Sequence, residues 1–573
     1  MAAPDARTLA TLLATLDDAS LAALLDERRI PPSVGWDDYF DAADALLDPA
    51  SVGRGLASLS REPAEALSTA VARSQAVAPG SARDRLVRSA LVTPDGEPYR
   101  AVASACPPLP PASDLPRSAE TVTEQDAAQA AERAFASATS LADVLQSALA
   151  LPLTRIGSGA LGASDRRRLV DAHAVETADA ADELLAIAAA AGLVAGTDRH
   201  WLVTSRGVEW LTLRTVSRWH EVARRVRDAL PAGLRRSGEG WIPVPQWPDA
   251  YPFDPSWPER AERWRVLFMR WALISPRGAV PPWAAALAEG EDADEATLQA
   301  LLPTEVDRVF LQNDLTAIAP GPLEPALDMR LRSMAHRETR AQASTYRFTA
   351  ESLSAALTAG ETAESLREFL SSLSLTGLPQ PLAYEIERNA RRHGNVQVGP
   401  DGIGNTRVTA DDRSLLQALA VDQALRPLGL VMDADGLLTR STPETTFWML
   451  ADARYPVTAV DVEGRPRMLD RHRVAAEAPL RPATEVYAAL LARLREAHDT
   501  DADSAWLGRE LDQAVRAHAV LVIVVRLPDG SNREITMEAT GLGGGRLRGR
   551  DRVADVERTL PVSSIVSIRP ATA

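Results

Sequence analysis

The sequence predicts a multidomain α+β protein with a mostly helical N-terminal half and a small β-barrel at the C-terminal end. The chain has 573 residues, which is too long for one hydrophobic core, so about three to five domains are expected. Leucines recur at helical spacing through residues 9–25, whereas residues 519–542 read as a β-hairpin. Helix-rich and strand-rich stretches that follow one another in this way are typical of the α+β class.

The charge balance limits the chemistry that this chain can perform. Its 62 basic and 78 acidic residues give a net charge of −16, so any nucleic-acid contact must use local basic patches. All the basic residues are arginine, because the sequence contains no lysine. A P-loop lysine, a Schiff-base lysine and a lysine general base are therefore excluded.

The single cysteine and the hydropathy pattern favour a cytoplasmic location. Cys106 cannot form an internal disulfide, which fits a reducing compartment. The sequence shows no long apolar run of membrane-span type, and the N-terminus lacks the pattern of a signal peptide.

The first two predicted domains are helical and winged-helix-like. Short Ala/Leu-rich helices fill 1–106, and a proline-rich linker follows. In 124–232, Ser164 and Thr177 are the expected N-caps of two helices, and a hairpin comes after them. Two helices followed by a hairpin is the element order of a winged helix.

Three further regions complete the expected organisation. Residues 233–300 form an arm rich in Trp and Pro with adjoining helices, which we expect to pack by its aromatic side chains. Residues 303–470 alternate strands and helices, as an α/β domain does, with Thr349 and Thr362 as N-caps. Residues 480–573 combine a helix with a five-stranded barrel, whose first hairpin turns at Asp529-Gly530.

Two arginine clusters are the candidate nucleic-acid contacts. The first alternates along "GRLRGRDR", which would point its side chains one way as a ridge suited to phosphates: Arg546, Arg548, Arg550 and Arg552. A solvated strand edge that discourages sheet pairing is the alternative. The second cluster opens the winged-helix pattern: Arg166, Arg167 and Arg168. The helix after it carries Asp179, Asp182 and Glu183 and no arginine, which favours a protein partner over a DNA groove there.

No catalytic, cofactor or metal constellation is expected. "GSGALG" at 157–162 matches G-x-G-x-x-G but lacks the parallel strand–helix units of a dinucleotide fold, so a glycine-rich helix entry is the better interpretation. The histidines are scattered, and one cysteine cannot build a Cys-rich zinc site.

The segment 309–399 resembles the N-terminal domain of XPB-type DNA repair helicases. The resemblance is carried by the "TYRFT" strand, the "FL..LS" helix, the exit "RHGNVQV", and a "Q.D.T" pattern that reads Gln312, Asp314 and Thr316 here. In that family the domain precedes the motor and is implicated in sensing distorted DNA. This chain has no lysine, no D-E-x-H box and no room for two motor lobes after residue 470. The resemblance therefore implies a helicase-associated protein rather than a helicase.

The last 60 or so residues resemble, more distantly, the WYL domain of bacterial regulators. "ERTLPVSSI" matches that family's closing strand through Arg558 and Ile565, although the Trp-Tyr-Leu motif itself is replaced by "GRLRG". The resemblance implies a nucleotide or nucleic-acid ligand, which agrees with the arginine ridge.

Together these observations lead to one expected function and one alternative. We expect a non-enzymatic, DNA-associated accessory or regulatory protein linked to an XPB-type helicase, DNA repair or transcription, with DNA and a helicase or other DNA-processing protein as partners and no cofactor. The alternative is a protein–protein interaction scaffold that does not bind DNA directly, which the acidity of the chain favours. A nuclease would need clustered carboxylates, and the sequence offers only scattered ones.

Overall fold

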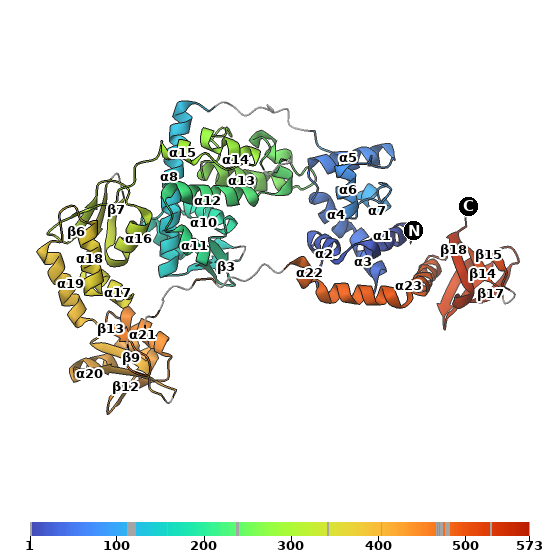
Figure 1. Cartoon of the computed structure of the whole chain (residues 1–573). Helices are drawn as coiled ribbons and strands as arrows, with labels where there is room; N and C mark the ends of the chain where they lie inside the picture. The colour runs from blue at the N-terminus through green and yellow to red at the C-terminus, as the bar shows by residue number, and fades with distance from the viewer. Residues whose placement is uncertain are drawn as a thin grey trace. The chain divides into compact units, whose positions relative to one another are not determined.

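The computed structural model describes residues 3–111, 122–157, 159–236, 240–340, 343–402, 404–465, 467, 469, 474–475, 482–527 and 530–571. The chain divides into two compact units, each assembled from separate stretches of sequence (Figure 1). One contains 1–115, 246–261 and 479–573, and the other contains 116–245 and 262–478. Both contain helices and small sheets, so the multidomain α+β class is confirmed. The finer five-part division remains a prediction.

The first unit begins with short helices around a leucine-rich core. They are α1 Ala3–Thr15, α2 Asp18–Glu27, α3 Tyr39–Leu47, α4 Pro49–Ala57, α5 Arg61–Arg73, α6 Ser81–Arg88 and α7 Arg100–Ala105. Leu490, Leu491 and Leu494 join the same core. They come from α23 Ala488–Arg516, which follows the short α22 Ala483–Val486. Segments more than 450 residues apart in sequence are thereby joined, since the Tyr487 hydroxyl donates to the Ile30 carbonyl at 2.6 Å.

A five-stranded antiparallel sheet ends this unit. Its strands are β14 Val520–Arg526, β15 Asn532–Gly543, β16 Arg546–Asp551, β17 Val556–Pro561 and β18 Ile565–Pro570, with the 3-10 turn η5 Val562–Ser564 before the last. The spatial order is β17-β16-β15-β14-β18. The described residues show no pairing between β17 and β18, so barrel closure remains a prediction. The expected hairpin is present as β14 and β15, although Asp529 lies outside the described residues.

The second unit begins with a long helix and a small sheet. The two expected helices are present, and the two strands of the expected hairpin follow them. These elements are α8 Glu124–Ala150, β1 Leu153–Ile156, β2 Ala160–Leu161, α9 Ala163–Asp171, α10 Ala178–Ala190, β3 Val194–Gly196 and β4 His200–Val203. The sheet order is β2-β1-β4-β3. Thr177 caps α10 as expected. Ser164 is not a cap, because α9 begins one residue earlier and Gly162 is its N-cap.

Helices rich in tryptophan follow along the chain, and residues 246–261 among them belong to the first unit. The helices are α11 Ser205–Trp210, α12 Thr215–Asp228, η1 Ala232–Leu234, η2 Val244–Asp249, α13 Trp257–Arg270, η3 Pro282–Ala284, α14 Ala285–Glu289 and α15 Glu295–Gln299. Trp219 and Trp271 are fully buried, and each indole N–H donates to the other residue's carbonyl, at 2.7 and 2.9 Å. The tryptophans of the predicted arm, Trp241, Trp247 and Trp257, are also buried. The expected packing through aromatic side chains is therefore confirmed.

The rest of this unit has two sheets with separate cores. The first has the order β5-β6-β8-β7, and its elements are β5 Phe310–Leu311, β6 Thr316–Ala319, α16 Pro325–Met334, β7 His336–Arg340, β8 Ser344–Arg347, α17 Ala350–Thr358, α18 Ala363–Leu373 and α19 Gln380–Arg392. The second has the order β11-β12-β10-β9-β13, and its elements are β9 Val396–Pro400, β10 Thr406–Ala410, α20 Arg413–Val421, η4 Gln423–Leu428, β11 Val431–Asp433, β12 Gly436–Thr439, α21 Pro443–Asp452 and β13 Val457–Ala459. Thr349 and Thr362 cap α17 and α18 through reciprocal hydrogen bonds with the serine three residues on.

Candidate nucleic-acid interface

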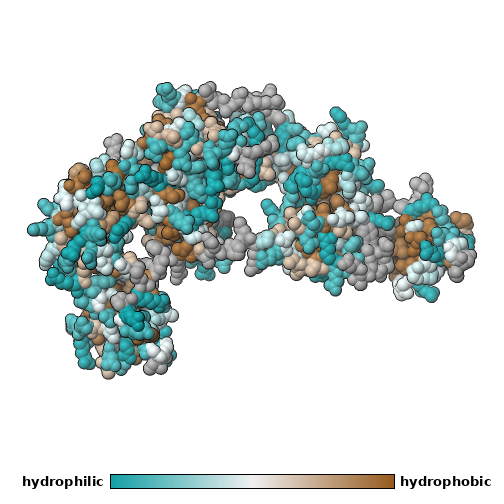
Figure 2. Space-filling model, in the orientation of Figure 1, coloured by the Kyte–Doolittle hydropathy of each residue, from teal (hydrophilic) through white to brown (hydrophobic). Residues whose placement is uncertain are grey.

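The arginines of β16 lie on one face of the C-terminal sheet. Along this strand Arg546, Arg548 and Arg550 are exposed, and the residues between them are buried. The alternation follows from the two-residue period of a strand. Figure 2 shows apolar as well as polar residues on the visible surface of the C-terminal sheet.

One end of the ridge is neutralised by carboxylates. Arg550 pairs with Asp555 at 2.8 Å, and Arg552 pairs with Glu538 at 2.5 Å. Arg550 also lies opposite Glu538 on β15 and opposite Glu557 on β17. A phosphate approaching Arg550 would meet these acidic groups, so this end is poorly suited to an anion.

At the other end of the ridge, no acidic residue lies directly opposite an arginine in the neighbouring strands. Arg546 lies between Gly543 and Pro561, and Arg548 lies between Gly541 and Thr559. Within the described part of the chain, neither guanidinium has an ion-pair partner. Because glycine presents no side chain, these two arginines stand above the surface and can approach a phosphate from several directions.

Arg558 holds the turn that aligns β16 with β17. Its Nε donates to the buried Asp551 carboxylate at 2.6 Å, and that carboxylate also accepts from the backbone N–H groups of Val553 and Ala554. The backbone bond from Ala554 and the bond from Arg558 lower the pKa of Asp551. Arg558 therefore has a structural role in this sheet.

The second predicted cluster, on α9, is largely engaged within the protein. Arg166 pairs with Asp182 at 2.9 Å, and Arg168 pairs with Asp165 at 2.9 Å and donates to the Ser147 hydroxyl. Arg167 is exposed and has no ion-pair partner among the described residues. Of these three arginines, only Arg167 is both exposed and without an ion-pair partner among the described residues.

The acidic residues of α10 also have partners inside the unit. Asp182 accepts from Arg166, and Glu183 pairs with Arg270 of α13 at 2.6 Å. The sequence analysis took three acidic residues of this helix as evidence against insertion into a DNA groove. Two of them form ion pairs within the protein. Sequence spacing could not reveal this, because Arg270 lies 87 residues from Glu183.

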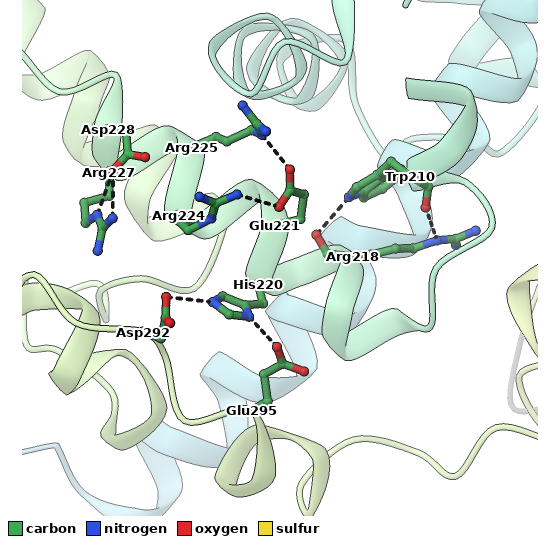
Figure 3. A network of polar contacts seen from close by, with 10 residues as sticks. All are labelled: Trp210, Arg218, His220, Glu221, Arg224, Arg225, Arg227, Asp228, Asp292 and Glu295. Carbon is green, nitrogen blue, oxygen red and sulfur yellow. Dashed lines mark hydrogen bonds and ion pairs between the residues drawn. The ribbon is translucent and has the colours of Figure 1, made fainter. Parts of the chain in front are cut away.

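Helix α12 is rich in arginine, and the sequence analysis did not single it out. Figure 3 shows that its cations face carboxylates and carbonyls of the same unit. Glu221 pairs with Arg225 at 2.6 Å and with Arg224 at 3.1 Å, while His220 contacts Glu295. Arg218 is buried against the Trp210 ring, and burial lowers its pKa to about 10. These contacts make α12 a packing helix with little free positive charge.

The "Q.D.T" pattern closes a turn between the first two strands of its sheet. The buried Thr316 hydroxyl lies 3.1 Å from Gln312 Oε1 and 2.5 Å from Asp314 Oδ1. Leu315, between them, takes a left-handed conformation with φ of 64°. The pattern therefore has a local structural role: its hydrogen bonds hold the turn that joins the paired strands β5 and β6.

The described residues contain no cluster of three or more His, Cys, Asp or Glu side chains arranged to hold a metal ion. No helix in the described part of the chain is both long and apolar enough to cross a membrane.

One comparison with known proteins places a helicase-related region in this chain. Residues 309–434 match the family described as "Helicase conserved C-terminal domain". No curated protein matches the chain. The match covers the whole first sheet, with the "Q.D.T" turn and α19, and strands β9, β10 and β11 of the second sheet, whose β12 and β13 lie beyond residue 434. It supports a helicase-related domain, and gives no support to the narrower resemblances to an XPB N-terminal domain and to a WYL domain.

Proposed function

We propose that this protein is a non-enzymatic, DNA-associated accessory or regulatory factor that works with a helicase. The observation that carries the proposal is the helicase family match at 309–434 in a chain without lysine. A helicase motor needs a P-loop lysine on the nucleotide phosphates. The matched domain would then act without an ATP-driven motor of its own.

The element order around α9 and α10 supports a winged-helix unit within this factor. Strand β1 precedes the two helices and pairs with β4, the second strand of the hairpin that follows them. We propose that this unit, the helicase-type domain and the barrel-like C-terminal sheet are separate modules. The XPB-type link, roles in DNA repair or transcription, and a cytoplasmic location belong to the same proposal.

Arg546 and Arg548 are the proposed phosphate contacts. They are exposed, lie side by side on one strand face and are flanked by glycines rather than acids. Local cationic groups of this kind can bind a polyanion even when the whole chain is acidic. Arg167 is a secondary candidate on α9.

A salt-titrated binding assay on forked, single-stranded and duplex DNA tests the proposal. We expect saturable binding that weakens as salt rises, because bound phosphates release counterions when they are neutralised. Full-length protein that binds none of the three DNAs at low ionic strength would contradict DNA association.

An interaction scaffold that does not touch DNA is the second candidate. Its support is the intramolecular pairing of Arg166, Arg168, Arg550 and Arg552, which removes much of the positive charge that the sequence offers. Capture of a helicase by the full-length protein, together with no DNA binding at low salt, would favour the scaffold. Capture that depends on nuclease-sensitive DNA would favour the accessory factor.

A further inference from the structure

A groove of about 750 Å³ opens within the second unit, beside the helicase-type domain. Much of its wall comes from three helices: α17 contributes Glu351 and Ser354, α19 contributes Asn389 and Arg392, and α21 leads into Arg454 and Tyr455; the ends of α8 and α16 also line it. Two of the three helices, α17 and α19, lie inside the matched residues 309–434. A hollow of this size between two separately packed sheets is where small-molecule sites most often form.

The groove carries a net positive charge in an acidic chain. Its charged lining side chains are two arginines and one glutamate. Arg454 pairs with Glu351 at 2.5 Å across the groove, and both side chains remain mostly exposed. Arg392 is exposed and has no ion-pair partner among the described residues. One guanidinium is therefore uncommitted at the rim, and the other can exchange its carboxylate for a ligand anion.

The backbone at Arg454 takes a left-handed conformation where α21 ends beside the groove. Its φ is 65°, in the left-handed region that follows the end of α21 and that glycine fills most easily. A non-glycine residue there costs on the order of 1 kcal/mol or more.

Aromatic and amide groups complete the lining. Trp448 and Tyr455 both contribute to the wall, and the Tyr455 hydroxyl donates to Asp422 at 2.7 Å, which fixes its ring. Asn389 donates its Nδ2 to the Glu385 carbonyl at 2.8 Å, so its amide oxygen remains an acceptor for a base edge. Ser333, Ser354 and Thr358 add hydroxyl groups.

We infer that this groove binds a nucleotide unit, with Arg392 and Arg454 on the phosphate and the aromatic wall against the base. The nucleotide could be free or an unpaired residue of a strand, since both present the same ring and phosphate. The inference deepens the proposed function and rests on it, because it assigns a nucleic-acid contact to the helicase-type region itself.

The lining favours a nucleotide over an acidic peptide. Arginine forks fit phosphate oxygens in a bidentate way, and aromatic rings stack on any base. An acidic peptide can also pair with the arginines and donate a backbone N–H to Asn389, but it offers no flat base to stack on the aromatic wall.

Two adjacent arginines give a matched pair of variants for the test. Arg391 and Arg392 end the same helix, both are exposed, and only Arg392 lines the groove. Binding of full-length protein to a thymidine oligonucleotide is measured against salt, alongside binding of free thymidine monophosphate. For Arg392→Ala we expect the log–log salt slope for the oligonucleotide to fall by about 0.7, and for Arg391→Ala we expect no change.

Photocrosslinking with an iododeoxyuridine-substituted oligonucleotide locates the base. The inference predicts crosslinks in the peptide that contains Trp448 and Tyr455. Equal salt slopes for the two variants, or crosslinks confined to other peptides, would overturn the groove assignment while DNA binding itself persists. Binding of the monophosphate without the oligonucleotide would identify a free nucleotide as the ligand. A protein that binds neither probe and none of the forked, single-stranded or duplex DNAs would overturn the proposed function as well.

Discussion

Asp143 is a buried carboxylate that contacts two arginines within the second unit. It is 3% exposed on α8, pairs with Arg332 at 2.6 Å and also contacts Arg337. The two arginines lie 189 and 194 residues further along the chain. No periodicity or spacing in the sequence could reveal this contact, because it depends on how α8 packs against α16 and β7.

Replacing Asp143 should therefore destabilise the unit strongly. Asp143→Ala removes the buried carboxylate from the half-buried Arg332 and Arg337, of which Arg332 keeps a longer contact with Asp328, and we expect a loss of about 1–3 kcal/mol. The control is Glu132→Ala, an exposed acid on the same helix, which we expect to stay within about 0.5 kcal/mol. Chemical unfolding measures both, and equal stabilities would show that the buried cluster adds nothing.

His393 should make the same unit sensitive to mild acid. Burial lowers the pKa of its imidazole from 6.5, its Nε2 lies 3.2 Å from the Thr458 hydroxyl, and its Nδ1 is buried without a hydrogen-bond partner among the described residues. The unfolded chain then binds the proton more tightly than the folded chain. Stability contributed by the neutral imidazole is present above pH 6.5 and is lost as pH falls below it.

The His393→Gln variant isolates this effect. We expect the melting temperature of the wild-type protein to fall between about pH 7.5 and about pH 5.5, and the variant to fall less, because glutamine does not titrate. Acidic side chains titrate in both proteins and cancel in the comparison. Identical pH profiles would mean that the buried imidazole is not the titrating group.

At the scale of elements, β16 shows how far sequence reasoning reaches. The alternation in "RLRGRD" correctly predicted that Arg546, Arg548 and Arg550 share one face, because a strand's period is fixed by its backbone. It could not predict which of them would be neutralised. That depends on register, which places Glu538 and Glu557 opposite Arg550 and glycine opposite the other two.

The two halves of the ridge should therefore differ in DNA binding. Removing Arg546 and Arg548 together should lower the log–log salt slope by about 1.4 to 1.8, since each lost phosphate contact removes about 0.7 to 0.9. Removing Arg550 and Arg552 should change it much less, because both are already paired with carboxylates. Equal effects of the two double variants would show that the ion pairs do not restrict access.

The N-cap residues of helices could be predicted from the sequence more often than the residues that contact the helix side chains. Thr177, Thr349 and Thr362 cap the helices that the sequence assigned to them, because an N-cap bond is local. Ser164 failed as a cap because Gly162 lies close to Thr154 of β1 and starts the helix earlier. The partners of α9, α10 and α12 come from distant residues and were not predictable.

At the scale of the whole molecule, residues 309–434 match a helicase family in a chain that contains no lysine. The sequence indicated both features, and the family match at 309–434 supports the first. The groove beside this region could not be predicted, because Arg392 and Arg454 are 62 residues apart and meet only through the packing of α17, α19 and α21. The residue motifs therefore indicated a helicase-related region, and the groove beside it was found only in the structure.

ATP hydrolysis by the purified full-length protein in the presence of saturating DNA tests the central claim most directly. The account predicts DNA binding in the same sample with no hydrolysis above the buffer rate, because no lysine is available to hold the nucleotide phosphates in a P-loop. ATP hydrolysis that is stimulated by DNA, and that stays with the protein through its final purification step, would contradict it.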